Sequence, residues 1–301
     1  MVRRLVGMLG IVIAATACSS VAPPVDSSQS TDPETTIIST SATQPSAPTP
    51  ATIAYGTDPS QYGQLWLPAD ADAGAGGEPL PVVVLIHGGF WRAEYGLDLM
   101  DGLAADLAAR GRAVWNIEYR RVGQDGGGYP GTLEDVAAAI DALLGIATTH
   151  HLDLADVVFV GHSAGGELAL WAACRGALAP GAPGAGPVVI PRLAIGQGPV
   201  VDLVAGDRLG LGGGAVTDFI GGTAAEFPDR YAIASPSTAA GVRLAVVRGA
   251  EDQIVPASFT LPSDSAQAAR IDVVDVDGAD HFALIDPTSS AWQAVLTLIA
   301  A

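Results

Sequence analysis

The sequence of 301 residues contains no lysine: all 14 of its basic residues are arginine, against 32 acidic residues. A Walker A phosphate loop, a pyridoxal Schiff base and a serine–lysine dyad each need the lysine amine, so these three chemistries are excluded. The formal net charge of -18 also argues against a nucleic acid partner, because phosphate binding needs a basic surface.

Cysteine is equally scarce, with only Cys18 and Cys174 in the chain. Two cysteines cannot build a zinc cluster or a disulfide framework, and we expect no metal and no cofactor. Apolar residues make up 49% of the sequence, which is enough for one large core. Any chemistry must therefore depend on serine, histidine, aspartate and glutamate.

The N-terminus has the pattern of a signal for export. Arg3 and Arg4 precede the apolar run 5–17, which is shorter than the roughly 20 residues that span a bilayer. This pattern is typical of a secretory signal peptide. Cys18 follows directly and resembles the cysteine of a bacterial lipobox, although lipoboxes usually carry leucine where this chain has Ala15. We expect a lipoprotein anchored by Cys18 to the outer face of the cell membrane; plain secretion is the alternative.

The next segment, 18–52, is rich in serine, threonine, proline and alanine. It has too few large apolar side chains to offset the entropy of ordering, which predicts a flexible tether. The predicted organisation is a signal peptide at 1–17, a lipidated tether at 18–52 and one globular domain at 53–301.

The globular part alternates between two kinds of apolar pattern. Continuous β-branched runs such as 81–86 are typical of strands buried on both faces, and they alternate with runs of helical spacing. This alternation predicts an α/β fold with a mostly parallel sheet, which binds ligands at the carboxyl ends of its strands. The expected strands are 64–67, 81–86, 113–119, 157–160, 193–195, 244–247 and 271–276, and the expected helices are 97–110, 132–144 (capped by Thr132), 164–175 and 290–300.

A G-x-S-x-G motif, Gly161-His162-Ser163-Ala164-Gly165, connects an expected strand to an expected helix. That context indicates a sharp turn which lifts the serine hydroxyl clear of the sheet. Glycine at positions 161 and 165 allows the strand and the helix to pack closely around the turn. Ser163 is therefore the candidate nucleophile, and a simple serine helix cap is the alternative.

A serine nucleophile needs a histidine base, and the chain has five histidines. His162 is adjacent to the serine and cannot turn its ring back onto the hydroxyl. His87 lies in a glycine turn, and His150 and His151 lie at a helix-to-strand junction. His281 follows the last expected strand, which suits the order serine, acid, histidine. We therefore predict His281 as the base.

The acid that orients the histidine should follow the strand 244–247. Asp252 is the predicted residue; Glu251 is the neighbour that could replace it, and Asp202 is a more remote alternative. The acid holds one ring nitrogen and stabilises the imidazolium.

The sequence His87-Gly88-Gly89-Phe90-Trp91 offers backbone N–H groups that side chains do not crowd. We predict that Gly89 and Phe90, together with Ala164, form an oxyanion hole. A plain glycine turn after a strand is the alternative.

These elements in this order resemble an α/β-hydrolase over about 55–301. The resemblance implies a mostly parallel central sheet flanked by helices on both faces. The His-Gly-Gly-aromatic-Trp sequence is similar to the motif of kynurenine formamidase, and the wider chain resembles bacterial carboxylesterases that include feruloyl-esterase-like enzymes. One departure is Glu167, where related sequences often carry histidine. The further matching stretches are Glu118-Tyr119-Arg120-Arg121, Gly128-Tyr129-Pro130-Gly131, Asp135, Ala234-Ser235-Pro236 and Gly249 to Pro256.

The resemblance implies a serine hydrolase that cleaves small-molecule carboxylic esters through an acyl-enzyme, with no obligate protein partner evident. The alternatives are an amide-type hydrolase (aminopeptidase-like or formamidase-like) and a non-catalytic binding protein on the same fold. The glycine-rich segment 202–222 is expected to be a mobile lid or a long loop. Cys174 is expected to be a small core residue.

Overall fold

A sheet of eight strands runs through the residues that the computed structural model describes, which are 49–69, 77–237 and 241–301. The predicted signal peptide, Cys18 and almost all of the tether lie outside these residues. The strand order is β1-β2-β4-β3-β5-β6-β7-β8, parallel except for β1 with β2 and β2 with β4. The strands are β1 (Ala51–Ala54), β2 (Tyr62–Trp66), β3 (Leu80–Ile86), β4 (Ala113–Ile117), β5 (Leu152–His162), β6 (Leu193–Gln197), β7 (Arg243–Gly249) and β8 (Ile271–Val276).

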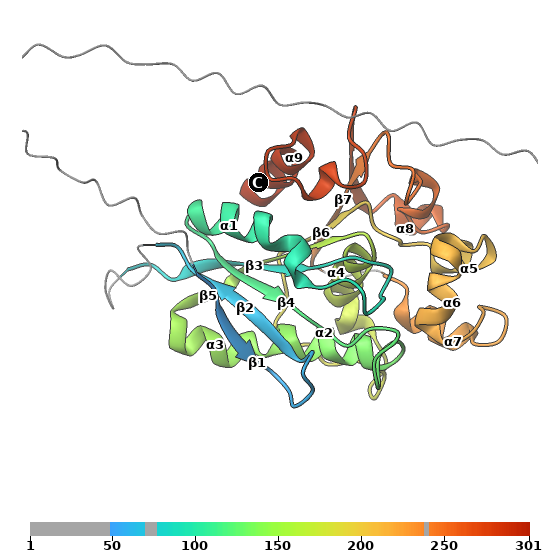
Figure 1. Ribbon diagram of the computed structural model, residues 1–301, viewed down its shortest axis with the longest axis horizontal. Helices are drawn as coiled ribbons and strands as arrows, with labels where there is room; N and C mark the ends of the chain where they lie inside the picture. Colours follow the sequence, from blue (N-terminus) through green and yellow to red (C-terminus); the bar gives the residue numbers. More distant parts are fainter. Residues whose placement is uncertain (1–48, 70–76, 238–240) are drawn as a thin grey trace, which may run out of the picture. The chain divides into compact units, whose positions relative to one another are not determined.

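Helices cover both faces of this sheet, which confirms the predicted α/β class (Figure 1). The α-helices are α1 (Asp101–Ala109), α2 (Gly131–Asp141), α3 (Leu143–His150), α4 (Ala164–Cys174), α5 (Leu203–Arg208), α6 (Ala215–Ile220), α7 (Pro228–Ala234), α8 (Ser265–Ala268) and α9 (Ser290–Ala300). The 3-10 turns are η1 (Leu97–Met100), η2 (Arg175–Ala177), η3 (Leu211–Gly213), η4 (Ala257–Phe259) and η5 (Ala283–Ile285).

The continuous apolar run of β3 is explained by these two layers of helices. Val82, Val84 and Ile86 pack in one core with α2, α3 and α4, whereas Val83 and Leu85 pack in the other with α1 and α9. Successive side chains of a strand point to opposite faces, so a strand covered on both faces must be apolar throughout.

Parallel pairing brings the carboxyl ends of the central strands together. Ile86 of β3 is in register with Gly161 of β5, and Gly161 is in register with Gly196 of β6. The glycine turn after β3 and the G-x-S-x-G turn after β5 are therefore neighbours, although they are far apart in the sequence.

Three local expectations need correction. The helix predicted over 97–110 divides into η1 and α1. The helix α2 begins one residue before Thr132, whose hydroxyl donates to the carbonyl of Arg120 instead of capping the helix. The strand β1 begins at Ala51, within the segment predicted as tether, because a short exposed edge strand carries no apolar pattern.

The glycine-rich segment 202–222 forms two short helices, α5 and α6, rather than a plain loop. Asp202 begins α5 by accepting a hydrogen bond from the backbone N–H of Ala205. The turn between the helices uses glycines at positive φ, including Gly210 and Gly214. In the described part of the chain, no helix has both the length and the apolar character needed to cross a membrane.

Candidate active site

Ser163 occupies a strained turn between β5 and α4. Its φ of 54° and ψ of -122° lie in a region that residues other than glycine rarely adopt. The flanking glycines are required by space, since a Cβ on Gly161 would lie 2.0 Å from the carbonyl oxygen of Gly165. A Cβ on Gly165 would lie 2.2 Å from the carbonyl oxygen of Ile86. The backbones of β5 and α4 are therefore in direct contact at this turn, and the turn places Ser163 at the edge of the sheet.

His281 and Asp252 meet at the same edge, after β8 and β7 respectively. The Nδ1 atom of His281 lies 2.6 Å from Oδ2 of Asp252, and both side chains are buried. The other carboxylate oxygen accepts hydrogen bonds from the backbone N–H groups of Ile254 and Val255. Burial raises the pKa of Asp252, but the hydrogen bonds from His281 and Val255 outweigh it, so that the pKa lies below its ordinary value. This carboxylate is ionised and fixed in orientation.

Ser163 and His281 line one small cavity of about 100 Å³. No hydrogen bond joins the serine hydroxyl to the histidine ring within the described residues. Catalytic hydrogen bonds often tighten only when substrate binds, so this geometry is compatible with proton transfer. The other lining residues are Gly89, Phe90, Tyr95, Leu99, His162, Ile254, Phe282 and Ile285.

The glycine turn after β3 lies directly against the serine turn. A Cβ on Gly88 would lie 2.9 Å from Cβ of Ser163. The next three residues, Gly89, Phe90 and Trp91, all have positive φ, at 107°, 53° and 54°. Within the described residues, the backbone N–H groups of Gly89, Phe90 and Ala164 donate to no protein acceptor. All three predicted oxyanion donors therefore remain available for a ligand oxygen.

The comparisons with known proteins bear on the fold. Residues 70–183 match the family BD-FAE. Esterase B from Lactobacillus rhamnosis superposes with a TM-score of 0.68 at 20% identity, over 85% of each chain. The fold is that of an α/β-hydrolase. Sarin-phosphonylated esterase 2 from Thermogutta terrifontis gives a TM-score of 0.62 at 19% identity, over 84% of this chain and 94% of that one.

Part of a bifunctional GH43-CE protein from Bacteroides eggerthii also superposes on this chain, with a TM-score of 0.66 and 21% identity. The match covers 82% of this chain but only 37% of that larger chain. No curated protein matches the sequence. The predicted resemblance to bacterial carboxylesterases of the α/β-hydrolase fold is confirmed.

The remaining histidines of the hydrolase fold have other surroundings. His87 lies 2.9 Å from a carboxylate oxygen of Glu118 and stacks on Tyr119. The Nε2 atom of His162 donates to the backbone carbonyl of His281 at 3.0 Å, and burial lowers the pKa of His162 to about 3. His150 and His151 lie at the end of α3, away from the sheet edge that carries Ser163.

The two alternative acids are not at the histidine. The side chain of Glu251 is exposed, and Asp202 is the cap of α5. A residue that sequence reasoning missed is Gly198, whose φ is 53°. A Cβ there would lie 3.0 Å from Oδ2 of Asp252 and 3.4 Å from Nδ1 of His281. Its signal was the Gly-Gln-Gly-Pro sequence that ends β6, because a glycine at the end of such a strand is close to the site.

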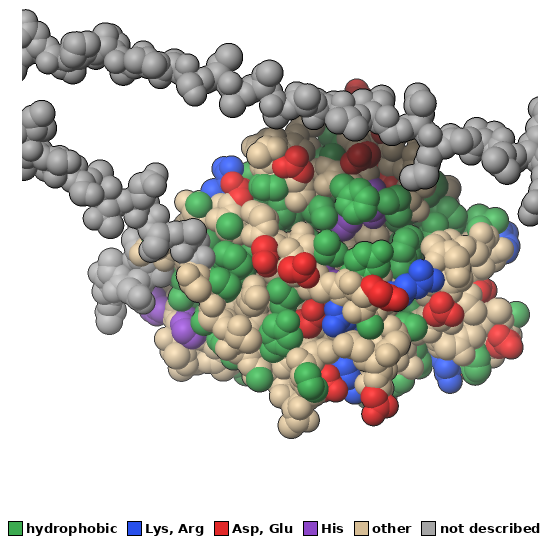
Figure 2. Space-filling view, viewed as in Figure 1, with side chains coloured by type: hydrophobic (Ala, Val, Ile, Leu, Met, Phe, Trp, Pro, Cys, Tyr) green, Lys and Arg blue, Asp and Glu red, His purple; other side chains and the backbone are tan. Residues whose placement is uncertain are grey.

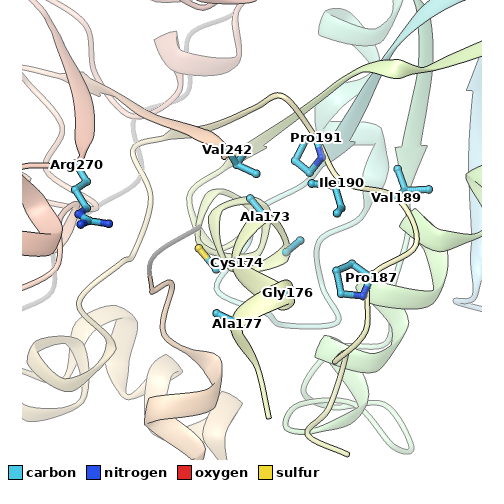
Figure 3. A pocket seen from close by; sticks show the side chains of 11 residues that line it. Ala173, Cys174, Gly176, Ala177, Pro187, Val189, Ile190, Pro191, Val242 and Arg270 are labelled. Carbon is cyan, nitrogen blue, oxygen red and sulfur yellow. The ribbon is translucent and has the colours of Figure 1, made fainter. Parts of the chain in front are cut away.

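A second cavity, of about 400 Å³, lies at the other end of α4 (Figure 3). Cys174 lines it together with mostly small apolar residues and Arg270. Burial raises the pKa of the Cys174 thiol to about 11, as expected for a core cysteine that does not act as a nucleophile. None of the sequence-predicted active-site residues lines this cavity.

Proposed function

We propose that the protein is a serine esterase that hydrolyses carboxylic esters through an acyl-enzyme, with Ser163, His281 and Asp252 as its triad. The observation that carries this proposal is the buried bond between His281 and Asp252 beside the cavity that also holds Ser163. The esterase neighbours support it, and one of them has been phosphonylated by sarin.

The hydrogen bonds of His281 decide which ring nitrogen acts as the base. A carboxylate oxygen can only accept, so Nδ1 carries the proton that is shared with Asp252. The other nitrogen, Nε2, is then free to take the proton of the Ser163 hydroxyl. The serine oxygen attacks the ester carbonyl carbon, and the N–H groups of Gly89, Phe90 and Ala164 stabilise the oxyanion.

Collapse of the tetrahedral intermediate breaks the bond to the alcohol, which leaves with the proton from the imidazolium of His281. A water molecule then gives a proton to the same ring nitrogen and attacks the acyl-enzyme. A second collapse returns the proton to Ser163 and releases the acid. Asp252 stays ionised throughout and stabilises the imidazolium.

The cavity favours small, uncharged acyl groups. The lining contains no aspartate, glutamate or arginine, and five of the lining residues are large and apolar: Phe90, Leu99, Ile254, Phe282 and Ile285. On the face shown in Figure 2, one of the two groups of histidine atoms lies among hydrophobic side chains. The volume of this cavity, about 100 Å³, is below the roughly 300–1,000 Å³ of sites for drug-sized ligands.

A fluorophosphonate probe tests the proposal, because it reacts only with an activated serine. We expect stoichiometric labelling of the wild-type protein and none of the Ser163→Ala variant. An unlabelled wild-type protein would overturn the enzyme reading and favour a binding protein. Matched p-nitrophenyl butyrate and butyryl p-nitroanilide, together with N-formylkynurenine, then separate an esterase from an amide-type hydrolase that uses the same triad.

We also propose that the esterase is exported and anchored to the outer face of the cell membrane through lipidated Cys18. The support is the charged start, the short apolar run and the cysteine that follows it. Metabolic labelling with palmitate should mark the wild-type chain but not Cys18→Ser. If the wild-type chain is unlabelled and is found in the medium, the protein is secreted instead.

A further inference from the structure

Trp91 connects the turn 87–92 after β3, here called the oxyanion loop, to α4, the helix that follows Ser163. It follows Phe90 directly, and its indole Nε1 donates a hydrogen bond of 3.3 Å to Oε2 of Glu167. Glu167 lies in the first turn of α4, which begins after Ser163. Both side chains are fully buried, and within the described residues Oε1 of Glu167 has no partner. The mechanism described above leaves this buried acid without a role.

One face of the Trp91 ring is covered by α6. The ring stacks on Phe219 with centroids 4.6 Å apart and an angle of 4° between the planes. The neighbours of Trp91 in the sequence also contact the segment 202–222, which contains α6. The Phe90 ring lies over Gly212, and Nη2 of Arg92 donates to the carbonyl of Gly212 at 2.8 Å. Three consecutive residues of the oxyanion loop therefore contact the segment that contains α5 and α6.

The backbone of the loop explains why it needs these contacts. Phe90 and Trp91 both have positive φ although neither is glycine. Each such residue costs of the order of 1 kcal/mol or more, and it persists only where the surroundings hold it. A Trp91 ring that is held both by Glu167 and by Phe219 supplies this constraint next to the N–H groups that we assign to the oxyanion hole.

We propose that Glu167 and Phe219 are positioning residues of the oxyanion hole, which hold the Trp91 ring between them and thereby fix the N–H groups of Gly89 and Phe90. This inference rests on the proposed esterase function. Neither residue lines the cavity, so both act through Trp91 rather than on the substrate. The segment 202–222, which was expected to be a mobile lid or a long loop, therefore supports the oxyanion loop.

The chemistry of Glu167 makes the proposal testable by a conservative change. Burial raises the pKa of Glu167 well above its ordinary value and so favours the uncharged acid. An amide has the same shape and offers the same carbonyl oxygen to the indole. Glutamine should therefore preserve the contact, whereas leucine fills the space and removes the acceptor.

The experiment compares Glu167→Gln with Glu167→Leu in the full chain, on p-nitrophenyl butyrate. We expect Glu167→Gln to keep the wild-type kcat, and Glu167→Leu to lose about tenfold or more, because its buried indole N–H is left unpaired. The loss should appear in kcat with little change in KM, since the oxyanion forms only in the transition state. The affinity for a trifluoromethyl ketone analogue, which forms a tetrahedral oxyanion, should fall by the same factor.

Trp91→Phe and Phe219→Leu give independent tests if Glu167→Leu does not fold, and both should lower kcat in the same way. Trp292→Phe is the matched control, because the indole of Trp292 donates to a carboxylate of Asp106 at 2.7 Å outside the cavity. That variant should lose stability but keep its kcat.

Three results would overturn the inference: a wild-type kcat in folded Glu167→Leu and Trp91→Phe, an equal loss in Glu167→Gln, or an equal loss in Trp292→Phe. Failure of the proposed function is a different result, because the wild-type protein itself would then fail to hydrolyse esters or to react with the fluorophosphonate.

Discussion

The side chain of His162 supports the backbone of His281. The two rings lie with centroids 4.4 Å apart, and the Nε2 atom of His162 donates to the carbonyl oxygen of His281 at 3.0 Å. The residue before the nucleophile thus fixes the loop that carries the base, and the two ends of the triad are joined by a hydrogen bond that involves neither reacting atom.

Replacing His162 by phenylalanine should separate this support from acid–base chemistry. The ring shape is kept but the donor is lost, so the carbonyl of His281 is left unpaired and kcat should fall by about tenfold. Because burial keeps the pKa of His162 near 3, the ring does not titrate between pH 5 and 9. The acid limb of the pH–rate profile should therefore stay in place. A displaced acid limb in His162→Phe would contradict this account, and His150→Phe, a half-buried position at the end of α3, serves as the control.

Asp252→Asn tests which acid orients His281. Asparagine can present its amide N–H to the ring and so favour the wrong tautomer, which typically lowers kcat by about 10⁴-fold. The neighbouring Glu251→Gln should leave kcat unchanged, since the side chain of Glu251 is exposed. Steady-state rates on one ester are sufficient. A loss of less than tenfold in Asp252→Asn would show that another group carries the role.

Gly198→Ala should displace Asp252 and His281 through steric contact with the added methyl group. The added Cβ would lie 2.8 Å from Cδ1 of Leu284 and 3.0 Å from Oδ2 of Asp252, and the backbone φ of 53° is itself unfavourable for alanine. We expect a kcat lowered by about 10-fold to 100-fold, as is typical when catalytic groups are displaced by about 1 Å. The matched control is Gly186→Ala, a glycine at similar φ with open space around it. Equal losses in both variants would indicate a general effect of instability.

The parts of this molecule that the sequence predicts are those with a local pattern. The strands β3 and β8 and the helix α9 follow directly from apolar runs and spacing. The residues predicted for the site come together because parallel strands deliver their carboxyl ends to one edge, and the order of motifs along the chain reflects that geometry.

Other features depend on contacts between distant segments, which a single sequence does not reveal. Gly198 is required because its φ is positive and because Leu284, Asp252 and His281 leave no room for a Cβ there. Similarly, the role of Glu167 depends on Trp91, far away in the sequence. The segment 202–222 could be recognised as an insertion from its glycines, but its packing on the oxyanion loop could not.

The charge preference of the cavity gives a substrate prediction. A carboxylate on the acyl chain would lie unpaired among apolar side chains, at a cost of several kcal/mol. We therefore expect kcat/KM for the p-nitrophenyl ester of succinic acid to be at least about 100-fold below that for the butyrate ester. Phe282→Arg should narrow this ratio, because position 282 is 60% exposed and can carry a cation without burying it. The control Phe282→Leu should not, and similar rates on both esters in the wild type would refute the prediction.

Glu167 should also reveal itself in the pH dependence of stability. In the unfolded chain a glutamate ionises above about pH 4.3, whereas burial raises the pKa of Glu167 well above that value in the folded protein. Folding must therefore take up a proton at any pH between the unfolded and the folded pKa, so the wild-type free energy of unfolding falls as pH rises above about 4.3, by about 1.4 kcal/mol per pH unit until the folded pKa is reached. Glutamine bears no such cost. Urea unfolding at pH 4, 5.5 and 7 should show Glu167→Gln becoming progressively more stable than the wild type, while exposed Glu251→Gln shows no such trend. A stability difference for Glu167→Gln that is the same at all three pH values would mean that the buried acid is ionised, and Trp91 would then be held by a charge.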